Sequence, residues 1–223
     1  MKVTPIAITK PLVDGIDTAE ELISYCARVS NPSNQLNTET ASKLLGYCWN
    51  HKHWSIFEQA ELTVEIETSR AISAQILRHR SFVFQEFSQR YAKSTAFEDV
   101  NLRRQDTKNR QNSTDDLDAE TVKELQADID LFLGEAEDLY NVLLDYGVAK
   151  ECARMILPLT TQTRLYMKGN LRSWITYCIT RCGPETQLEH RQVAQECWKI
   201  VREQFPSVAT FVEAEHEHLK EII

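Results

Sequence analysis

The segment Gln59–Glu67, QAELTVEIE, changes the hydrophobic period of the chain and constrains the fold most. Its apolar residues alternate strictly with Glu and Thr, which is the pattern of a strand with one buried face and one wet face. The segments on both sides instead place apolar residues at helical spacing. No internal repeat and no shift in composition marks a second domain. The sequence therefore predicts one α+β domain over residues 1–223, mostly helical around a small, largely antiparallel sheet.

The other elements follow from apolar spacing and from capping and breaking residues. Asp, Thr and Asn precede the early helical segments, where they can cap a helix N-terminus. Pro158 ends a helical turn, because proline disfavours helix in the residue before it. We expect strands at 2–9, 59–67 and 162–168 and a turn at Asn31–Ser33. We expect helices at 17–30, 37–51, 69–80, 119–145, 170–181, 186–204 and 207–220, and a helical turn at 149–156.

Two neighbouring segments in the middle of the chain contrast in composition. Residues 101–118 are almost wholly polar, so we expect a mobile surface loop there. Residues 119–145 then show the pattern of a long amphipathic helix. The apolar stripe of this helix comprises Leu125, Ile129, Phe132, Leu133, Leu139 and Leu143, and the helix at 69–80 is expected to bury Ile72 and Leu77.

Composition and charge exclude several classes of protein. A hydrophobic share of 42% and a charged share of 26% are ordinary for a soluble globular chain. No window approaches the roughly 18 uninterrupted apolar residues of a membrane span, and the N-terminus lacks a secretory pattern. A formal net charge of −8 disfavours binding to nucleic acid and to anionic membranes. We therefore expect a cytoplasmic protein without membrane or nucleic-acid partners.

The six cysteines are scattered along the chain without a CxxC pair. In a chain of this size without a secretory signal, we expect reduced, half-buried thiols. The Cys and His residues also lack the paired spacing that a tetrahedral zinc site needs. We therefore expect no bound metal.

The densest group of charged residues is Arg78-His79-Arg80, followed after seven residues by Ser88-Gln89-Arg90. These cations repel one another unless an anion lies among them. Arginine presents a planar fork that matches phosphate or carboxylate in a bidentate way. The pattern therefore favours an anion site. A solvated basic face at a helix C-terminus, where cations are favoured, is the alternative that spacing alone leaves open.

Two further segments carry polar groups in otherwise apolar surroundings. ECARMILP places Arg154 on a helix that is apolar enough to be buried, and a buried guanidinium needs a partner. HKHWSIFE places His53 before the alternating strand, where a lone histidine is typically a capping or surface residue.

These segments together resemble a known family. RHR-x7-S-x-R at Arg78–Arg90 resembles the signature of the flavin-dependent thymidylate synthases, the ThyX family. HWSIFEQAELTVEIE, ECARMILP and NLRSW…TRCGPETQLE are similar to three further segments of that family, in the same order. The agreement runs from about His51 to Glu189 and omits mainly the polar stretch at 101–118.

The resemblance implies an activity, its co-substrates and an assembly. The family converts dUMP to dTMP by reductive methylation. 5,10-Methylenetetrahydrofolate supplies the carbon, and NADPH supplies the reducing equivalents through bound FAD. The resemblance also implies the ThyX-type fold and a homotetramer whose active sites are shared between chains.

The family's binding positions transfer residue by residue onto this chain. The positions that match the family's dUMP contacts are Gln75, Arg78, Glu86, Phe87, Ser88, Gln89, Arg90, Arg154 and Arg181. The positions that match its FAD contacts are His53, Ser55, Glu58, Arg78, His79, Arg80, Ser81, Gln85, Glu86, Asn170, Arg172 and Thr176.

Three of these residues are the implied catalytic group. Arg181 is the candidate for stabilising negative charge that develops on the uracil ring. Ser88, with Arg90, belongs to the phosphate side. His53 lies near the folate or nicotinamide face, as does Arg172. We expect no cysteine nucleophile, because a nucleophilic thiol needs nearby cations and exposure that no cysteine here clearly has.

Some positions depart from the family's commoner residues. Phe87 and Gln89 stand where Leu and Gly are common, and Ser81 and Gln85 stand where an aliphatic residue and Asn are frequent. Glu185 replaces a histidine near the flavin. Gln89 affects how the loop backbone approaches phosphate, and Glu185 affects the local FAD contacts.

Two alternative functions remain at this point. One is a nucleotide-binding oligomer without catalysis that kept the phosphate-binding arginines. The other is a helical nucleotide pyrophosphohydrolase, whose chemistry needs clustered carboxylates for magnesium. The acidic pairs Glu20-Glu21 and Asp115-Asp116 do not recur on one helical face.

Overall fold

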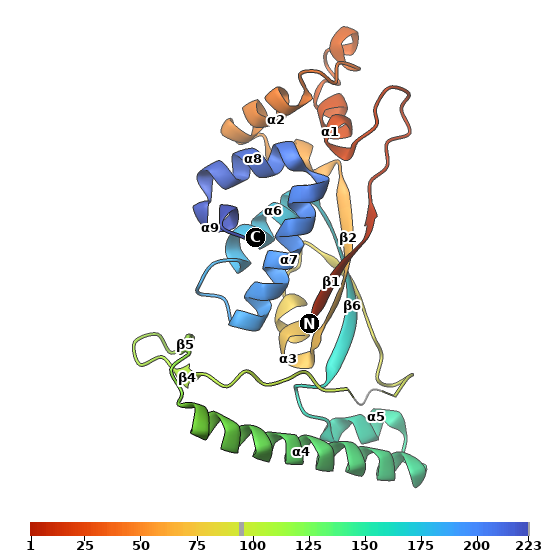
Figure 1. Cartoon of the computed structure of the whole chain (residues 1–223). Coiled ribbons are helices and arrows are strands. Elements are labelled where there is room, and N and C mark those ends of the chain that lie inside the picture. The colour runs from red at the N-terminus through yellow and green to blue at the C-terminus, as the bar shows by residue number, and fades with distance from the viewer. Residues whose placement is uncertain (94–95, 223) are drawn as a thin grey trace. The chain divides into compact units, whose positions relative to one another are not determined.

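The structure, a computed structural model, describes residues 1–93 and 96–222 (Figure 1). The chain folds into helices and antiparallel strands, which confirms the predicted α+β class. One sheet has the strand order β1 (Lys2–Ile8), β2 (Glu61–Ser69), β6 (Gln162–Asn170) and β3 (Val83–Glu86). The α-helices are α1 (Ala19–Ala27), α2 (Ala41–Asn50), α3 (Arg70–Ile76), α4 (Ala119–Asp145), α5 (Lys150–Ala153), α6 (Leu171–Arg181), α7 (Leu188–Gln204), α8 (Pro206–Glu215) and α9 (Glu217–Lys220). The described residues also form the 3-10 turns η1 (Pro32–Asn34), η2 (Trp54–Glu58) and η3 (Arg154–Ile156).

The chain divides into two compact units. Unit 1 comprises residues 1–2, 67–78, 85–93 and 96–165. Unit 2 comprises residues 3–66, 79–84 and 166–222. Strands β1, β2, β3 and β6 each have residues in both units. That residues 1–223 form one domain stays a prediction.

Strand β2 confirms the alternating pattern that the sequence showed. Leu62, Val64 and Ile66 are buried, whereas Thr63 and Glu65 between them keep contact with solvent. In unit 2 the indole N–H of Trp174, on α6, donates to the carbonyl of Leu62 at 3.0 Å. Each fully buried aliphatic side chain of this kind contributes about 1.5–3 kcal/mol of hydrophobic stabilisation. The buried face of β2 therefore fixes α6 in place.

The signature segment folds differently from the prediction. Helix α3 ends at Ile76 instead of continuing to residue 80, and Leu77 is 39% exposed where burial was expected. The chain leaves the helix because Phe82 is buried in unit 2 against Trp174, with ring centroids 4.8 Å apart. A Cβ at Gly169 would lie 2.5 Å from the ring of Phe82, so glycine is needed for this approach. The residues after Phe82 form β3, which the sequence analysis missed.

Helix boundaries elsewhere agree with the predictions to within a few residues. Helix α1 starts after Thr18, whose side chain accepts from Glu21 N while the Glu21 carboxylate accepts from Thr18 N. The helix at 119–145 has the predicted bounds. The segment predicted as one helix at 207–220 is two helices, because the backbone at His216 is not helical.

The polar stretch at 101–118 is more ordered than an open loop. Strand β4 (Arg104–Gln105) pairs antiparallel with β5 (Ser113–Thr114). The carboxylate of Asp106 accepts from the amides of Lys108 and Asn109 and from the side chain of Asn112, and these bonds close the turn between the strands. The hydrogen bonds also lower the pKa of Asp106. Polar composition alone gave no sign of this hairpin.

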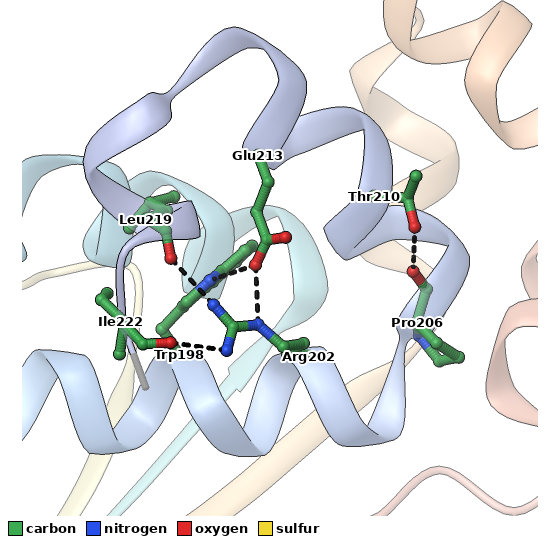
Figure 2. Close-up of polar contacts among 7 residues, drawn as sticks. All are labelled: Trp198, Arg202, Pro206, Thr210, Glu213, Leu219 and Ile222. Carbon is green, nitrogen blue, oxygen red and sulfur yellow. Dashed lines mark hydrogen bonds and ion pairs between the residues drawn. The ribbon is translucent and has the colours of Figure 1, made fainter.

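The C-terminal helices of unit 2 are fastened by one arginine on α7 (Figure 2). Arg202 Nε donates to the Glu213 carboxylate at 2.7 Å, and its terminal nitrogens donate to the carbonyls of Ile222 at 2.7 Å and Leu219 at 2.9 Å. The Trp198 indole N–H donates to the same Glu213 oxygen at 3.0 Å. Because Glu213 lies on α8, these contacts hold α8 and α9 against α7.

The six cysteines differ in burial, whereas the sequence predicted that all of them would be half-buried. Four are buried and Cys26 is half-buried, whereas Cys152 is exposed at the start of α5. Burial raises the pKa of the Cys178 and Cys197 thiols well above the ordinary range. No helix in the described part of the chain is long and apolar enough to span a membrane.

Candidate functional site

The end of the signature lines a hollow in unit 1. Ser88, Arg90 and Tyr91 face the first residues of α5 across a volume of about 340 Å³. Lys150 Nζ donates to the carbonyl of Tyr91 at 3.1 Å, so a second cation lies beside the arginine. A hydroxyl and two cations around one hollow are suited to an anion the size of a phosphate.

Arg90 is already oriented in this hollow by an acidic partner. Its Nε and Nη2 lie 3.1 and 3.0 Å from one carboxylate oxygen of Glu151. The side chains are 66% and 55% exposed, so solvent screens the pair and its contribution to stability is small. An incoming anion therefore competes with Glu151 for the arginine fork.

Glu86 is the centre of a hydrogen-bond network in unit 1. One carboxylate oxygen accepts from Ser73 Oγ at 2.6 Å and from Thr163 Oγ1 at 3.0 Å, and it lies 3.0 Å from Arg70 Nη1. The side chain thereby fixes the end of β3 to α3 and β6. Sequence reasoning found Glu86 by resemblance but missed Arg70, Ser73 and Thr163.

Gln89 lies inside the protein, although it belongs to the turn of the signature. It is 6% exposed, and its Nε2 has no hydrogen-bond partner among the residues that the structure describes. A buried amide nitrogen without a partner costs on the order of 1–3 kcal/mol. Such a group marks a position where a ligand atom or a water molecule would be bound.

The remaining predicted nucleotide residues of unit 1 surround this loop to different extents. Gln75 is half-buried in α3, and Arg78 is exposed two residues beyond the helix. The Phe87 amide donates to the carbonyl of Arg164 at 2.8 Å. The expected burial of Arg154 is wrong, because it is only half-buried and its neighbour Met155 is 78% exposed. Arg154 therefore keeps contact with solvent.

In unit 2 the signature histidine contacts the candidate catalytic arginine. Arg181 Nε donates to His79 Nε2 at 3.0 Å. The imidazole must accept through Nε2, so it is neutral and carries its proton on Nδ1. Burial, followed by the charge of Arg181, lowers the pKa of His79 below its ordinary value. His79 is therefore not one of the repelling cations that the sequence analysis counted.

A second histidine lies behind this pair. The Tyr177 hydroxyl and His190 Nε2 are 3.1 Å apart, and both side chains are buried. The Tyr177 ring meets the ring of His79 edge-on, with centroids 4.9 Å apart. Burial, followed by the positive charge of Arg181, lowers the pKa of His190 to about 3. Sequence reasoning missed His190, since a single histidine on an amphipathic helix gives no functional signal.

An aromatic pocket of about 410 Å³ in unit 2 contains two of the predicted flavin residues. Arg172 and Thr176 line it from α6, Trp49 lines it from α2, and Trp54 lines it from η2. The indole N–H of Trp49 is buried and has no hydrogen-bond partner in the described part of the chain. Lys52 Nζ lies 5.5 Å from the centroid of Trp54. Glu215 and His216 at the end of α8 also line this pocket, and Arg202 on α7 holds α8 through Glu213 (Figure 2).

The other predicted flavin residues of unit 2 have local contacts of their own. Arg172 Nη1 lies 2.5 Å from the Glu58 carboxylate. Asn170 caps α6, because its Oδ1 accepts from Ser173 N at 2.9 Å. The carbonyl of Ser81 accepts from Ser173 Oγ at 3.4 Å. The side chains of His53, Ser55 and Arg80 are exposed.

Most of the residues predicted to bind dUMP lie in unit 1, and most of those predicted to bind FAD lie in unit 2. Unit 1 contains Gln75, Arg78, Gln85, Glu86, Phe87, Ser88, Gln89, Arg90 and Arg154. Unit 2 contains His53, Ser55, Glu58, His79, Arg80, Ser81, Asn170, Arg172, Thr176 and Arg181. Apart from Arg181, every predicted dUMP residue is in unit 1, and nine of the twelve predicted FAD residues are in unit 2.

Comparisons with known proteins show the family to which the chain belongs. The family model described as "Thymidylate synthase complementing protein" matches residues 11–207. The chain is 52% identical over 205 residues to a protein named probable flavin-dependent thymidylate synthase from Paramecium bursaria Chlorella virus 1, covering 92% of this chain and 95% of that protein. The chain belongs to the flavin-dependent thymidylate synthase family.

One further relative and one solved structure extend the comparison. The flavin-dependent thymidylate synthase of Synechocystis is 51% identical over 216 residues, covering 96% of this chain and all (100%) of that protein. A crystal structure of a UMP/dUMP methylase from Streptomyces cacaoi bound with 5-Br dUMP matches 98% of this chain and 96% of its own with a TM-score of 0.82. At 20% identity, this likeness concerns the fold alone. The family and fold predicted from the signature are thus confirmed, and the chain is an enzyme of this class.

Proposed function

We propose that this enzyme converts dUMP to dTMP by reductive methylation in the cytoplasm, with 5,10-methylenetetrahydrofolate as the carbon donor and NADPH as the reductant through FAD. The observation that carries the proposal is the hollow of unit 1, in which Ser88 and Arg90 of the signature meet Lys150. Because the protein has a net charge of −8, a local cluster of cations indicates an anionic substrate. A dianionic 5′-phosphate satisfies the charge that the hollow presents.

The nucleotide would be held mainly by unit 1. The phosphate would accept from the Ser88 hydroxyl and from the arginine fork of Arg90, in competition with Glu151. The buried Nε2 of Gln89 would donate to an acceptor atom of the bound nucleotide. The remaining contacts predicted for dUMP are Gln75, Arg78, Glu86, Phe87 and Arg154.

Activation of the base would depend on Arg181. C5 of uracil is a weak nucleophile, and a guanidinium at the carbonyl edge stabilises negative charge as it develops on the ring. His79 is neutral and accepts from Arg181 Nε, so it orients the arginine without cancelling its charge. The terminal nitrogens of Arg181 are the ones that would face the base.

The residues of unit 2 fit a flavin. A planar ring system needs aromatic walls, and an unpaired buried N–H donor and nearby cations suit its polar edge and its phosphates. The pocket of Trp49, Lys52 and Arg172 supplies all three features. When bound, FAD would supply the redox chemistry, while His53, Glu58 and Thr176 with the other flavin residues would bind and orient it. His53 and Arg172 would also face the folate or the nicotinamide.

A cysteine nucleophile has no support in the contacts of this chain. Cys182 is buried beside Arg181, whose Nε is already bonded to His79. Cys152 is exposed, but Arg154, the nearest arginine in sequence, lies in η3 and not in the same helix. Among the described residues, no group of three His, Cys, Asp or Glu side chains is placed to hold a metal. We therefore propose that polarisation, rather than a protein–nucleotide bond, activates the uracil.

The active enzyme would be a homotetramer with sites shared between chains. Helix α4 supports this proposal, because Leu125, Phe132 and Leu139 recur every seven residues and are 44%, 56% and 50% exposed. A repeat of this kind forms a continuous apolar seam that a second helix can cover. These three residues of the predicted stripe are thus exposed in a single chain, and a second copy would bury them.

A flavin absorbance spectrum, recorded with and without dUMP, tests this proposal. We expect the purified enzyme to be yellow, with about one FAD per chain, and dUMP to perturb the flavin bands. Addition of NADPH should then bleach them. The spectrum also separates the enzyme from a nucleotide-binding protein without catalysis, which would bind dUMP and remain colourless.

A further inference from the structure

Arg70 occupies an unfavourable place for a cation. It is the first residue of α3, where the helix dipole disfavours positive charge by roughly 0.3–1 kcal/mol. Its side chain is largely buried, and its Nε has no partner among the residues that the structure describes. A guanidinium kept at such a position needs a specific partner. Its partners are Glu86 and Phe87, which directly precede the turn Ser88–Arg90.

The two terminal nitrogens of Arg70 form a clamp on this segment. Nη1 lies 3.0 Å from the Glu86 carboxylate, and Nη2 donates to the carbonyl of Phe87 at 2.9 Å. Because the Phe87 amide is bonded to Arg164, both polar groups of the Phe87 backbone are held. The backbone at Phe87 is therefore fixed, and the turn that begins at Ser88 starts from a defined position.

The clamp is itself rigid, because the backbone that carries it is anchored. The amide of Arg70 donates to the carbonyl of Thr161 at 2.9 Å, and the next amide, of Ala71, donates to the carbonyl of Leu159 at 3.0 Å. Ser73 and Thr163 donate to the same carboxylate oxygen of Glu86 that Arg70 contacts. All of these contacts lie within unit 1.

We propose that Arg70 is a positioning residue that pre-orders the turn Ser88–Arg90 for the phosphate of the nucleotide. It acts through Phe87 and Glu86 and does not touch the substrate. Two separate contacts from one planar group are needed, which arginine provides and lysine does not. The inference rests on the proposed function only in naming dUMP as the nucleotide.

The test compares Arg70→Ala, Arg70→Lys and the wild-type flavoprotein. Arg104→Ala is the matched control, because it removes an exposed ion pair with Asp116 in the same unit. Hydrogen exchange of peptides covering residues 87–93 is measured without nucleotide, and steady-state kinetics give KM for dUMP and kcat. We expect Arg70→Ala to speed exchange in these peptides and to raise KM by about tenfold or more. We expect kcat at saturating dUMP to stay within about twofold, because Arg70 does not contact the reacting atoms.

The lysine variant guards against a purely structural effect. Arg70→Lys keeps a cation for Glu86 but cannot also reach the Phe87 carbonyl, so it should fold normally and still raise KM and exchange. Wild-type exchange and KM in both variants would overturn the proposal, as would changes equal to those of Arg104→Ala. A wild-type protein that fails to bind dUMP would contradict the proposed function, while the exchange data would still decide the role of Arg70.

Discussion

Arg181 donates its Nε–H to Nε2 of His79 at 3.0 Å, so the histidine of the RHR signature is a neutral hydrogen-bond acceptor. A proton on His79 would remove this bond and place two positive charges side by side. Burial and the charge of Arg181 both lower the pKa of His79. The orientation of the candidate catalytic arginine thus depends on the neutral state of its neighbour.

The first prediction concerns the ionisation of His79. Nitrogen-15 NMR of labelled histidine at pH 7 should show the neutral tautomer protonated at Nδ1, with no titration near 6.5. Arg181→Gln should move the pKa of His79 upward, because it removes one of the two causes of the shift. A wild-type His79 that titrates at or above 6.5 would contradict the assigned hydrogen bond.

The second prediction concerns His190 and the stability of the fold at low pH. Its pKa is lowered to about 3, so the unfolded state binds more protons than the native state between about pH 3 and 6.5. Stability from this group is therefore present above pH 6.5 and is lost as the pH falls through this window. His190→Gln should make the free energy of unfolding less dependent on pH between 7 and 5. Urea unfolding at both pH values measures this, and equal slopes for wild type and variant would refute it.

The third prediction assigns phosphate recognition to Arg90. A hydrogen bond to a charged group contributes about 1.5–3 kcal/mol. Arg90→Ala should therefore weaken dUMP binding by at least about tenfold and affect deoxyuridine, which lacks the phosphate, much less. Calorimetric titration with both ligands makes the comparison. If both ligands lose affinity equally, Arg90 supports the loop instead of binding phosphate.

The fourth prediction concerns the unpartnered amide of Gln89. Gln89→Leu removes a buried donor that has no described partner, so it should leave the ligand-free protein as stable as the wild type or more stable, by about 1 kcal/mol. The same change should weaken dUMP binding, because the bound nucleotide would lose that donor. Thermal unfolding with and without dUMP separates the two effects. A variant that is destabilised without ligand would show that a water molecule already satisfies the amide.

Local pattern predicted much of the fold because the signals were long or strictly periodic. The alternation of β2 and the long amphipathic run of α4 gave both elements their correct type. Strand β3 was missed because four residues are too few for a periodic signal. The early end of α3 was missed because it depends on Phe82 packing against Trp174, which is distant in the sequence.

The candidate site was predicted from the signature, but its supporting residues were not. The ionisable residues of RHR-x7-S-x-R stand out in any sequence, and family resemblance named them. Arg70 and His190 act through contacts with residues 13 or more positions away, such as Glu86 and Tyr177, and no spacing rule indicates these pairs. The burial of Arg154 was predicted wrongly, because apolar neighbours on a short helix can face solvent.

The transfer of a labelled carbon tests the central claim most directly. The flavoprotein is incubated with dUMP, NADPH and 5,10-methylenetetrahydrofolate that carries carbon-13 in its methylene group, and the nucleotides are analysed by mass spectrometry. The account predicts dTMP with the label in its methyl group, and no dTMP when NADPH is omitted. Unlabelled dTMP, or no dTMP from flavin-loaded protein with all three compounds present, would contradict it.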